Sequence, residues 1–252
     1  MVKRAASAKV IAVIPARMAA QRFPGKPLAL IAGKPLVQWV WEAARAARRV
    51  DRVIVATDSD QIVEAVQAFG GEAMLTAPDC PSGTDRVAQV ARATHALIVV
   101  NVQGDEPLMA GTTIDKVVEA LQKDRQAVMS TAVRAAESEE EWQDPNVVKA
   151  VFDKKFYALY FSRAPIPWKR DPQASATGPR WVHMGIYGYR RDFLFRFAAL
   201  PPSSLEQVES LEQLRALEHG SRIKTVIVKH PSQGVDCPED VKKVERILAL
   251  RQ

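Results

Sequence analysis

A chain of 252 residues, of which 47% are hydrophobic, can bury a large core as one domain or as a large domain with a smaller appendage. Its only cysteines, Cys80 and Cys237, follow no pairing pattern and favour a reduced compartment, so we expect a cytoplasmic protein. The formal charge of +6 suits an anionic partner, and no apolar run approaches the roughly twenty residues of a membrane span.

The first half of the chain alternates apolar runs with helical patterns. The run KVIAVI at 9–14 predicts a strand rather than a signal peptide, because it is short and closes on Pro15 and Arg17. Similar runs without polar alternation predict strands covered on both faces at 51–57, 96–102 and 127–133. Helical patterns occupy 35–47, 59–69, 84–94 and 113–123. Asp58 and Gln61 resemble a capping box for the second helix.

This alternation predicts an α/β fold with a largely parallel sheet. After residue 134 the pattern changes, because the expected strands at 147–152, 157–162 and 184–190 are not separated by full helices. We therefore expect a smaller mixed subdomain or a sheet extension over approximately 134–200. The chain then returns to a strand at 224–229 and a helix at 237–251, with Cys237 near its cap and Pro238 at its first position.

The loop PARMAAQRFPGKPL places Arg17, Arg22 and Lys26 directly after the first strand, where open α/β sheets bind ligands. The patterns GxxxxGK[ST] and GxGxxG are both absent, which excludes a P-loop ATPase and a Rossmann dehydrogenase. A polyphosphate could still be bound by separate side chains, because arginine guanidinium groups and a lysine ammonium bind phosphate oxygens. Gly25 would let the backbone approach the phosphates. A solvated basic loop is the alternative.

Acidic residues follow two of the predicted strands. Asp105 and Glu106 come directly after the most apolar strand, and Asp236 stands at the equivalent place before the last helix. Carboxylates at these positions suit a hard divalent cation that also binds substrate phosphates, so Asp105 and Asp236 are candidates for one magnesium site. A turn aspartate and a helix-cap residue are the alternatives. The histidines lack metal-ligand spacing and no GxSxG or Cys-His pattern occurs, so neither zinc nor covalent catalysis is expected.

Ordered motifs across roughly residues 9 to 250 carry a family resemblance: IPARMAAQRFPGKPL, CPSGTDR, NVQGDEP, YFSRAPIPW, HMGIYGYR, LEQLRALEHG and GVDCPED. Together they resemble the 3-deoxy-manno-octulosonate (KDO) cytidylyltransferases, also called CMP-KDO synthetases. The resemblance implies a Rossmann-like three-layer nucleotidyltransferase fold with a largely parallel mixed sheet and a smaller dimerisation subdomain. It also implies Mg²⁺-dependent transfer of CMP from CTP to the anomeric hydroxyl of KDO, which releases pyrophosphate and activates KDO for lipopolysaccharide synthesis.

The resemblance assigns roles to individual residues. The triphosphate of CTP would contact Arg17, Arg22 and Lys26, and the rest of the nucleotide would lie near Ser82, Gly83, Arg86 and Gln103. Magnesium would bind Asp105 and Asp236, which together with Arg17 and Lys26 form the expected catalytic set. The sugar acid would lie against Arg163, His183, Tyr187, Glu212 and Gln213. The subdomain would mediate a homodimer.

Three positions depart from the usual family pattern. Ala20 and Gln21 replace a Ser-Thr pair in the first loop, which removes two hydroxyls near the expected phosphates. Cys237 replaces a common threonine, which removes a hydroxyl that would cap the last helix or orient Asp236. None of these changes alters a charged residue of the expected site.

Other interpretations remain open at this stage. Arg163 could be a rim residue, His183 and Tyr187 could belong to a strand packed on a core, and Glu212 could form a surface ion pair with Arg215 at i, i+3. A second candidate function is a cytidylyltransferase for another acidic sugar, such as 8-amino-KDO or a sialic acid. A third is a basic nucleic-acid-binding module, although scattered basic residues and the absence of an RNA motif disfavour it. We therefore expect neither a nucleic-acid partner nor membrane insertion.

Overall fold

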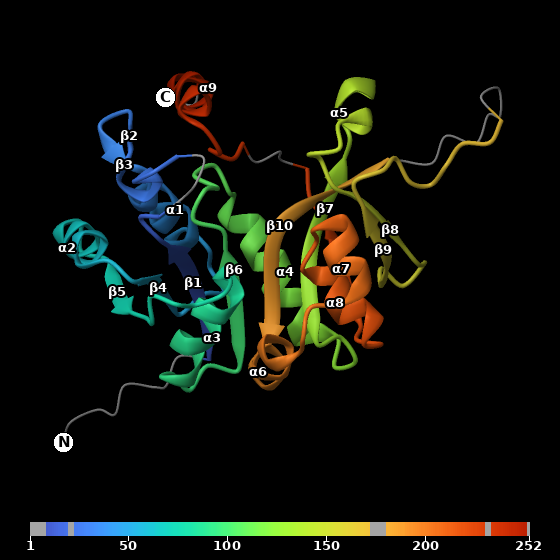
Figure 1. Cartoon of the computed structure of the whole chain (residues 1–252), viewed down its shortest axis with the longest axis horizontal. Helices are drawn as coiled ribbons and strands as arrows, with labels where there is room; N and C mark the ends of the chain where they lie inside the picture. Colours follow the sequence, from blue (N-terminus) through green and yellow to red (C-terminus); the bar gives the residue numbers. More distant parts are fainter. Residues whose placement is uncertain (1–8, 20–22, 172–179, 230–232, 251–252) are drawn as a thin grey trace.

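The computed structural model describes residues 9–19, 23–171, 180–229 and 233–250. Its main feature is a nine-stranded sheet in the order β11–β7–β10–β6–β1–β4–β5, which β8 and β9 extend beside β10 (Figure 1). The strands are β1 (Val10–Ala16), β4 (Arg52–Thr57), β5 (Glu72–Leu75), β6 (Ile98–Val102), β7 (Met129–Ala135), β8 (Lys149–Phe152), β9 (Ala158–Ser162), β10 (Trp181–Arg190) and β11 (Ile223–Ile227). A separate hairpin pairs β2 (Leu30–Ile31) with β3 (Lys34–Pro35).

Helices cover both faces of the sheet and give three layers. One face packs against α1 (Leu36–Arg45), α2 (Asp60–Ala68) and α4 (Gly111–Lys123), and α9 (Pro238–Ala249) adds Val244 to the same core. The other face packs against α3 (Gly83–Arg92), α6 (Arg191–Ala199) and α8 (Gln213–Glu218). Shorter helices are η1 (Lys26–Leu28), α5 (Glu139–Gln143) and α7 (Ser204–Glu209). This arrangement is the predicted three-layer α/β fold with a largely parallel sheet.

The side chains of β1 show why the apolar runs predicted strands correctly. Val10, Ala12 and Ile14 pack into the core on one face, whereas Ile11 and Val13 pack into the core on the other. Because successive side chains of a strand point to opposite faces, a strand buried on both sides needs an unbroken apolar run. β4 and β6 obey the same rule and lie beside β1 in parallel register.

The sheet is mixed because β10 runs antiparallel between β6 and β7. All other strands on the path from β11 to β5 run in one direction, so their carboxyl ends share one edge of the sheet. A register shift between Met184 and Tyr187 interrupts the pairing of β10 with β7. The loops after β1 and β6 therefore meet at one edge, beside the irregular part of β10.

Two details of the sequence interpretation need correction or extension. Ser59 is the N-cap of α2 and makes no side-chain cap, so the capping box proposed for Asp58 and Gln61 is wrong. Asp58 instead accepts a hydrogen bond from buried Arg86 at 2.8 Å. The boundary of an inserted subdomain over approximately 134–200 stays a prediction: β8 and β9 extend the sheet outward, whereas β10 runs through its centre.

No helix in the described parts of the chain combines the length and the apolar character that a bilayer crossing requires.

Candidate active site

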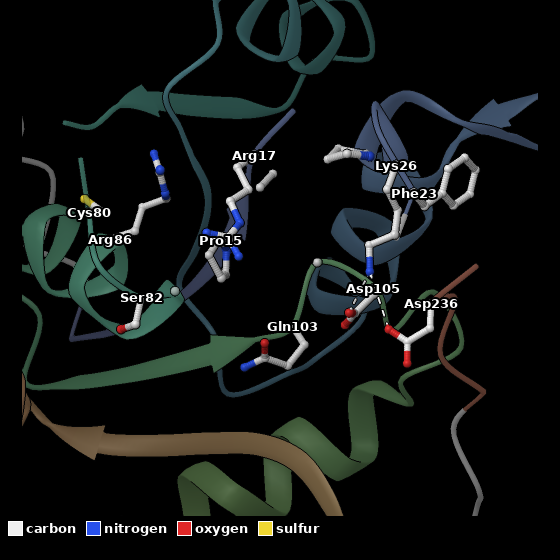
Figure 2. Close-up of a pocket in the computed structure, with 14 residues that line it drawn as sticks. Pro15, Arg17, Phe23, Lys26, Cys80, Ser82, Arg86, Gln103, Asp105 and Asp236 are labelled. Carbon is white, nitrogen blue, oxygen red and sulfur yellow. Dashed lines mark hydrogen bonds and ion pairs between the residues drawn. The ribbon is translucent and has the colours of Figure 1, made fainter. Parts of the chain in front are cut away.

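A cavity of about 470 Å³ opens at the carboxyl ends of β1 and β6 (Figure 2). The cavity collects expected site residues from loops that are far apart in sequence: Arg17, Lys26, Ser82, Gly83, Arg86, Gln103, Asp105 and Asp236. Further lining residues, which the sequence interpretation did not select, are Pro15, Ala16, Phe23, Pro27, Cys80 and Gly104. A cavity therefore lies where the sequence predicts a ligand site, outside the carboxyl ends of the strands.

The loop after β1 closes on itself and directs Lys26 into this cavity. Gly25 has a φ of 71°, a left-handed conformation that favours glycine, and its N–H donates to the Met18 carbonyl at 3.0 Å. The chain then turns into η1, whose first residue is Lys26. Arg22, Ala20 and Gln21 lie outside the described residues, so their expected roles stay predictions.

Lys26 joins the two candidate metal ligands. Its Nζ donates to Asp105 Oδ2 at 2.8 Å and to the Val235 carbonyl at 3.0 Å, and lies 3.8 Å from Asp236 Oδ1. Two carboxylates separated by more than a hundred residues of sequence thus converge on one cationic group, as Figure 2 shows. Such a pair suits a divalent cation that completes its shell with water and phosphate oxygens.

The position of Asp105 depends on the glycine before it. A Cβ on Gly104 would lie 2.5 Å from the Pro15 carbonyl oxygen, closer than real Cβ contacts come, so only glycine lets the ends of β1 and β6 approach this closely. Arg17 follows Pro15 by two residues. The same close approach therefore brings the cation of one loop and the carboxylate of the other to a single cavity.

The two arginines of the cavity differ in their availability. Arg86 is 3% exposed, and its guanidinium binds Asp58 and Thr76. These contacts fix Arg86 as part of the cavity wall. Arg17 has no ion-pair or hydrogen-bond partner among the described residues, and Figure 2 shows it inside the cavity. An unpaired guanidinium in a cavity is suited to an anionic ligand, because its fork matches phosphate oxygens.

No group of three or more His, Cys, Asp or Glu side chains that could hold a metal ion is present in the described ranges. A complete protein cage is not what magnesium requires, because it is usually bound by one or two carboxylates together with substrate phosphates and water. Asp105 and Asp236 have the number and chemistry of such ligands.

The expected sugar residues lie on the second half of the chain, on β10 and at the start of α8. Tyr187 donates its hydroxyl to Gln213 Oε1 at 3.0 Å, and its ring lies 5.5 Å from that of His183. Glu212, the N-cap residue of α8, accepts hydrogen bonds from Thr84 at 2.6 Å and from Ser82 at 3.2 Å. Since Ser82 also lines the cavity, these residues form a polar group that continues from the cavity wall.

Two members of this group have unusual environments. Gln213 is 2% exposed, and its Nε2 has no hydrogen-bond partner in the described structure. Loss of hydration lowers the pKa of His183 to about 3, so the ring is neutral at ordinary pH and any pH-dependent role lies well below 6. Because Thr131 Oγ1 donates to the Ile186 carbonyl at 2.7 Å, it accepts from His183 Nε2 at 2.8 Å, which places the proton on that nitrogen.

None of the five expected sugar residues is among the described residues that line the cavity, and Arg163 is held in structural contacts. Its guanidinium donates to the Glu209 carbonyl at 2.7 Å and to the Pro145 carbonyl at 3.0 Å, and its backbone N–H donates to Glu209 Oε2. These contacts join β9 to the end of α7. The role of Arg163 in sugar binding stays a prediction, whereas a structural role is directly visible.

Cys237 occupies the N-cap of α9, with Pro238 in the first turn, as predicted. Its thiol lies 3.2 Å from Asp240 Oδ2, and the same carboxylate accepts the backbone N–H of Asp236 at 3.0 Å. The helix is therefore capped without the threonine hydroxyl that is common in the family.

The comparisons with known proteins agree with this geometry. A model of the cytidylyltransferase family matches residues 11–223. A 3-deoxy-manno-octulosonate cytidylyltransferase of Syntrophobacter fumaroxidans is 50% identical over 245 residues, which cover 96% of this chain and 97% of that protein. One of Geobacter sulfurreducens is 49% identical over 93% of this chain and 97% of its own length. A solved CMP:2-keto-3-deoxy-manno-octonic acid synthetase complexed with CTP is 41% identical, covers 97% of this chain and 100% of its own, and has a TM-score of 0.91.

Proposed function

The chain belongs to the 3-deoxy-manno-octulosonate cytidylyltransferase family, and we propose that it transfers CMP from CTP to the anomeric hydroxyl of KDO. The reaction forms a bond between the sugar oxygen and the α-phosphorus, and breaks the bond from that phosphorus to pyrophosphate. The observation that carries the proposal is the cavity in which Arg17, Lys26 and two aspartates meet. The solved CTP complex of a relative that is 41% identical supports the nucleotide. Activation of KDO for lipopolysaccharide synthesis follows from the product.

The side chains of the cavity are suited to joining two anions. CTP and a sugar acid repel each other, so a site that brings them together must supply positive charge. Lys26 is 16% exposed, so its ammonium has reduced hydration and acts strongly on phosphate oxygens. Arg17 is exposed and has no partner among the described residues, so its guanidinium is available to the same oxygens. Charge accumulates on these oxygens as pyrophosphate leaves, and fixed donors stabilise the transition state more than the ground state.

We propose that Asp105 and Asp236 hold Mg²⁺ in this site. Their carboxylates lie 2.8 and 3.8 Å from the same Lys26 ammonium, so a single cation can bind both. When bound, Mg²⁺ neutralises phosphate charge and favours deprotonation of a hydroxyl that contacts it. Lys26 would then exchange its contact with Asp105 for the phosphates.

The sugar side is proposed to use Glu212, Gln213, Tyr187 and His183. The support is the buried Nε2 of Gln213, because an unsatisfied buried donor costs about 1–3 kcal/mol that a sugar hydroxyl would offset. Neutral His183 and the amide of Gln213 recognise hydroxyls, whereas neither supplies charge for the sugar carboxylate. Another acidic sugar with a similar set of hydroxyls is the second candidate substrate.

We further propose that the protein is a cytoplasmic homodimer, assembled through the segment around β9. Leu159 is 62% exposed on this strand, and Trp168 is 82% exposed on the segment that extends from it (Figure 1). Large apolar side chains on a projecting segment are suited to burial in a partner surface. Sedimentation equilibrium would test this directly, since a monomer at micromolar concentration would contradict it.

The reaction is tested by pyrophosphate release over a matrix of CTP, UTP, ATP and GTP against KDO, 8-amino-KDO and N-acetylneuraminate. We expect release only with CTP and KDO at substantial rate, and only with Mg²⁺ present. Faster release with another sugar would move the assignment to the second candidate. Salt-dependent RNA binding without any release would favour the nucleic-acid-binding alternative.

A further inference from the structure

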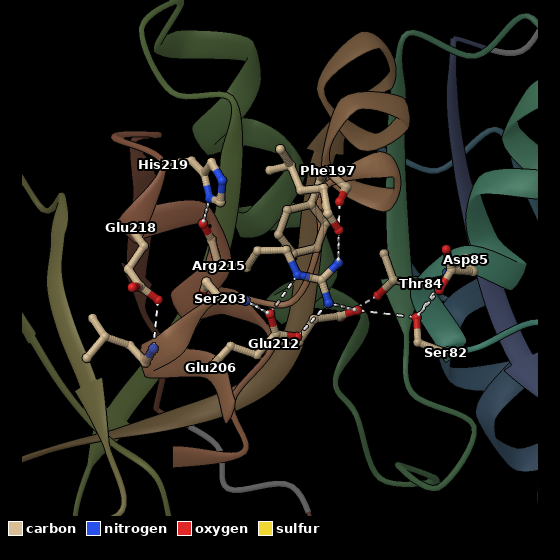
Figure 3. Close-up of polar contacts among 12 residues, drawn as sticks. Ser82, Thr84, Asp85, Phe197, Ser203, Glu206, Glu212, Arg215, Glu218 and His219 are labelled. Carbon is tan, nitrogen blue, oxygen red and sulfur yellow. Dashed lines mark hydrogen bonds and ion pairs between the residues drawn. The ribbon is translucent and has the colours of Figure 1, made fainter. Parts of the chain in front are cut away.

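A buried polar cluster connects the wall of the nucleotide cavity with the start of α8 (Figure 3). Thr84 Oγ1 donates to Glu212 Oε2 at 2.6 Å, across 128 residues of sequence. Thr84 is 3% exposed, whereas the Glu212 side chain keeps 28% exposure. The carboxylate is therefore held from behind by a buried hydroxyl and keeps one side open.

Ser82 is a weaker partner of the same carboxylate. Its hydroxyl lies 2.7 Å from Asp85 Oδ2 and 3.2 Å from Glu212 Oε1, but it has one proton to donate. The shorter contact favours donation to Asp85 over donation to Glu212. Thr84 is consequently the firm donor to Glu212, and Ser82 is shared between the two carboxylates.

Arg215 does not take over this task, although it follows Glu212 by three residues. Its guanidinium binds Glu206 at 2.7 and 2.5 Å and lies 4.0 Å from Glu212 Oε1. Arg215 is 9% exposed and also contacts the Phe197 and Leu200 carbonyls, so the alternative ion pair between Glu212 and Arg215 at i, i+3 is present as a long contact, but Arg215 is buried and does not lie on the surface. The short hydrogen bonds of the guanidinium go to Glu206, so the shortest hydrogen bond to Glu212 comes from the Thr84 hydroxyl.

We propose that Thr84 is a positioning residue that fixes the Glu212 carboxylate toward the sugar acid and thereby ties the sugar side of the site to the nucleotide wall. This proposal rests on the proposed function for the identity of the sugar. The hydrogen bond from Thr84 to Oε2 fixes the orientation of the Glu212 carboxylate. The second oxygen, Oε1, is then directed toward Ser82, which lines the cavity.

The charges around Glu212 make its protonation sensitive to Thr84. Burial raises the pKa of Glu212, and the hydrogen bond from Thr84 is the largest effect that lowers it, followed by the charge of Arg215. Glu206 on α7 raises the pKa of Glu212, and the hydroxyls of Tyr187 and Tyr189 face the carboxylate from β10. A variant without the Thr84 hydroxyl therefore has a Glu212 that protonates at higher pH.

The test compares Thr84→Val, which removes the hydroxyl at nearly constant volume, with Thr84→Ser, which keeps it. Thr94→Val is the matched control, because Thr94 is buried and donates to the Ala91 carbonyl at 3.1 Å, away from the site. We expect Thr84→Val to raise KM for KDO about tenfold and KM for CTP less than about twofold, as for a lost bond to a charged acceptor. Thr84→Ser and Thr94→Val should match the wild type in both constants.

Two further measurements separate positioning from general damage. The acid limb of kcat/KM for KDO should move to higher pH in Thr84→Val, and Glu212→Gln should remove the effect of Thr84→Val in a double-mutant cycle. The pKa of Glu212 itself, read by carbon NMR of labelled glutamate, should rise in Thr84→Val and return in Thr84→Ser. This reading needs no activity, so it decides the proposal even if the wild type fails to turn over KDO, a result that would refute the proposed function alone.

An unchanged Glu212 pKa in Thr84→Val would overturn the proposal, as would equal losses in Thr84→Val and Thr84→Ser. An undiminished effect of Thr84→Val in the Glu212→Gln background would also overturn it. If Thr84→Val does not fold, Thr84→Ala removes the same hydroxyl with a smaller side chain, and the same outcomes apply.

Discussion

Replacing Lys26 by alanine is expected to slow the transfer reaction strongly with little effect on sugar binding. Its ammonium is placed by contacts to Asp105 Oδ2 at 2.8 Å and the Val235 carbonyl at 3.0 Å, within the cavity that also holds Arg17. Removing one preorganised donor of transition-state charge costs about 3 kcal/mol, which corresponds to about a 150-fold loss of kcat.

The same substitution should leave the fold nearly intact. The Asp105 and Asp236 side chains are 34% and 54% exposed, so solvent screens their interaction with Lys26, and the loss in unfolding free energy should be about 1 kcal/mol or less. Lys34→Ala is the matched control, because Lys34 pairs with Glu42 at 2.9 Å and does not line the cavity. Its kinetics should equal those of the wild type.

Steady-state kinetics with CTP and KDO varied independently, together with urea unfolding, measure these effects. We expect Lys26→Ala to lose kcat while KM for KDO changes less than about threefold. The reasoning would be refuted by a variant that keeps its kcat, or by one whose main defect is a higher KM for KDO. The second result would place the loop on the sugar and not on the phosphates.

Three other predictions concern the metal, the sugar side and acid stability. Asp105→Asn and Asp236→Asn should each abolish Mg²⁺-dependent turnover while circular dichroism shows a folded protein, because an amide binds a hard cation poorly; full activity in either variant would remove that residue from the metal site. Gln213→Ala and Glu212→Ala should each raise KM for KDO and leave KM for CTP nearly unchanged. Kinetics with both substrates varied will measure the two constants, and equal effects on both would show that the start of α8 has only a structural role. The folded-state pKa of His183, about 3, lies below the unfolded value near 6.5, so only the unfolded chain takes up this proton as pH falls from 6.5 toward 3. The free energy of unfolding should therefore fall over that pH window, and it should fall less in His183→Gln. Identical pH slopes from urea unfolding of the two proteins would contradict the lowered pKa of His183.

The parallel part of the sheet was predictable because burial on both faces leaves a visible pattern. The runs at 51–57 and 96–102 became β4 and β6 within two residues at either end. β5 was missed because it is a four-residue edge strand with an exposed Leu75, which gives no continuous apolar run. α7 was missed although Ser203 and Glu206 form a capping box, a signal that the sequence displays.

The convergence of the expected CTP-binding and metal-binding residues on one cavity was predictable for a related reason. Arg17 and Asp105 follow the ends of the buried strands β1 and β6, and the carboxyl ends of parallel strands lie at the same edge of a sheet. Gly104 could have been selected by the same logic, as a glycine at a strand end beside a functional aspartate. The sugar side had no such local signal. The hydrogen bond between Thr84 and Glu212 joins residues that are 128 positions apart in the sequence, and only the folded chain brings them together.

The central claim is that this chain joins CMP to the sugar acid, and phosphorus NMR of the reaction mixture tests it most directly. With CTP, KDO and Mg²⁺ together, the account predicts one new phosphodiester resonance and an equal amount of pyrophosphate, with neither formed when KDO is omitted. Pyrophosphate accompanied by free CMP in the absence of KDO would show a CTP hydrolase and would contradict the account, as would unchanged CTP in the complete mixture.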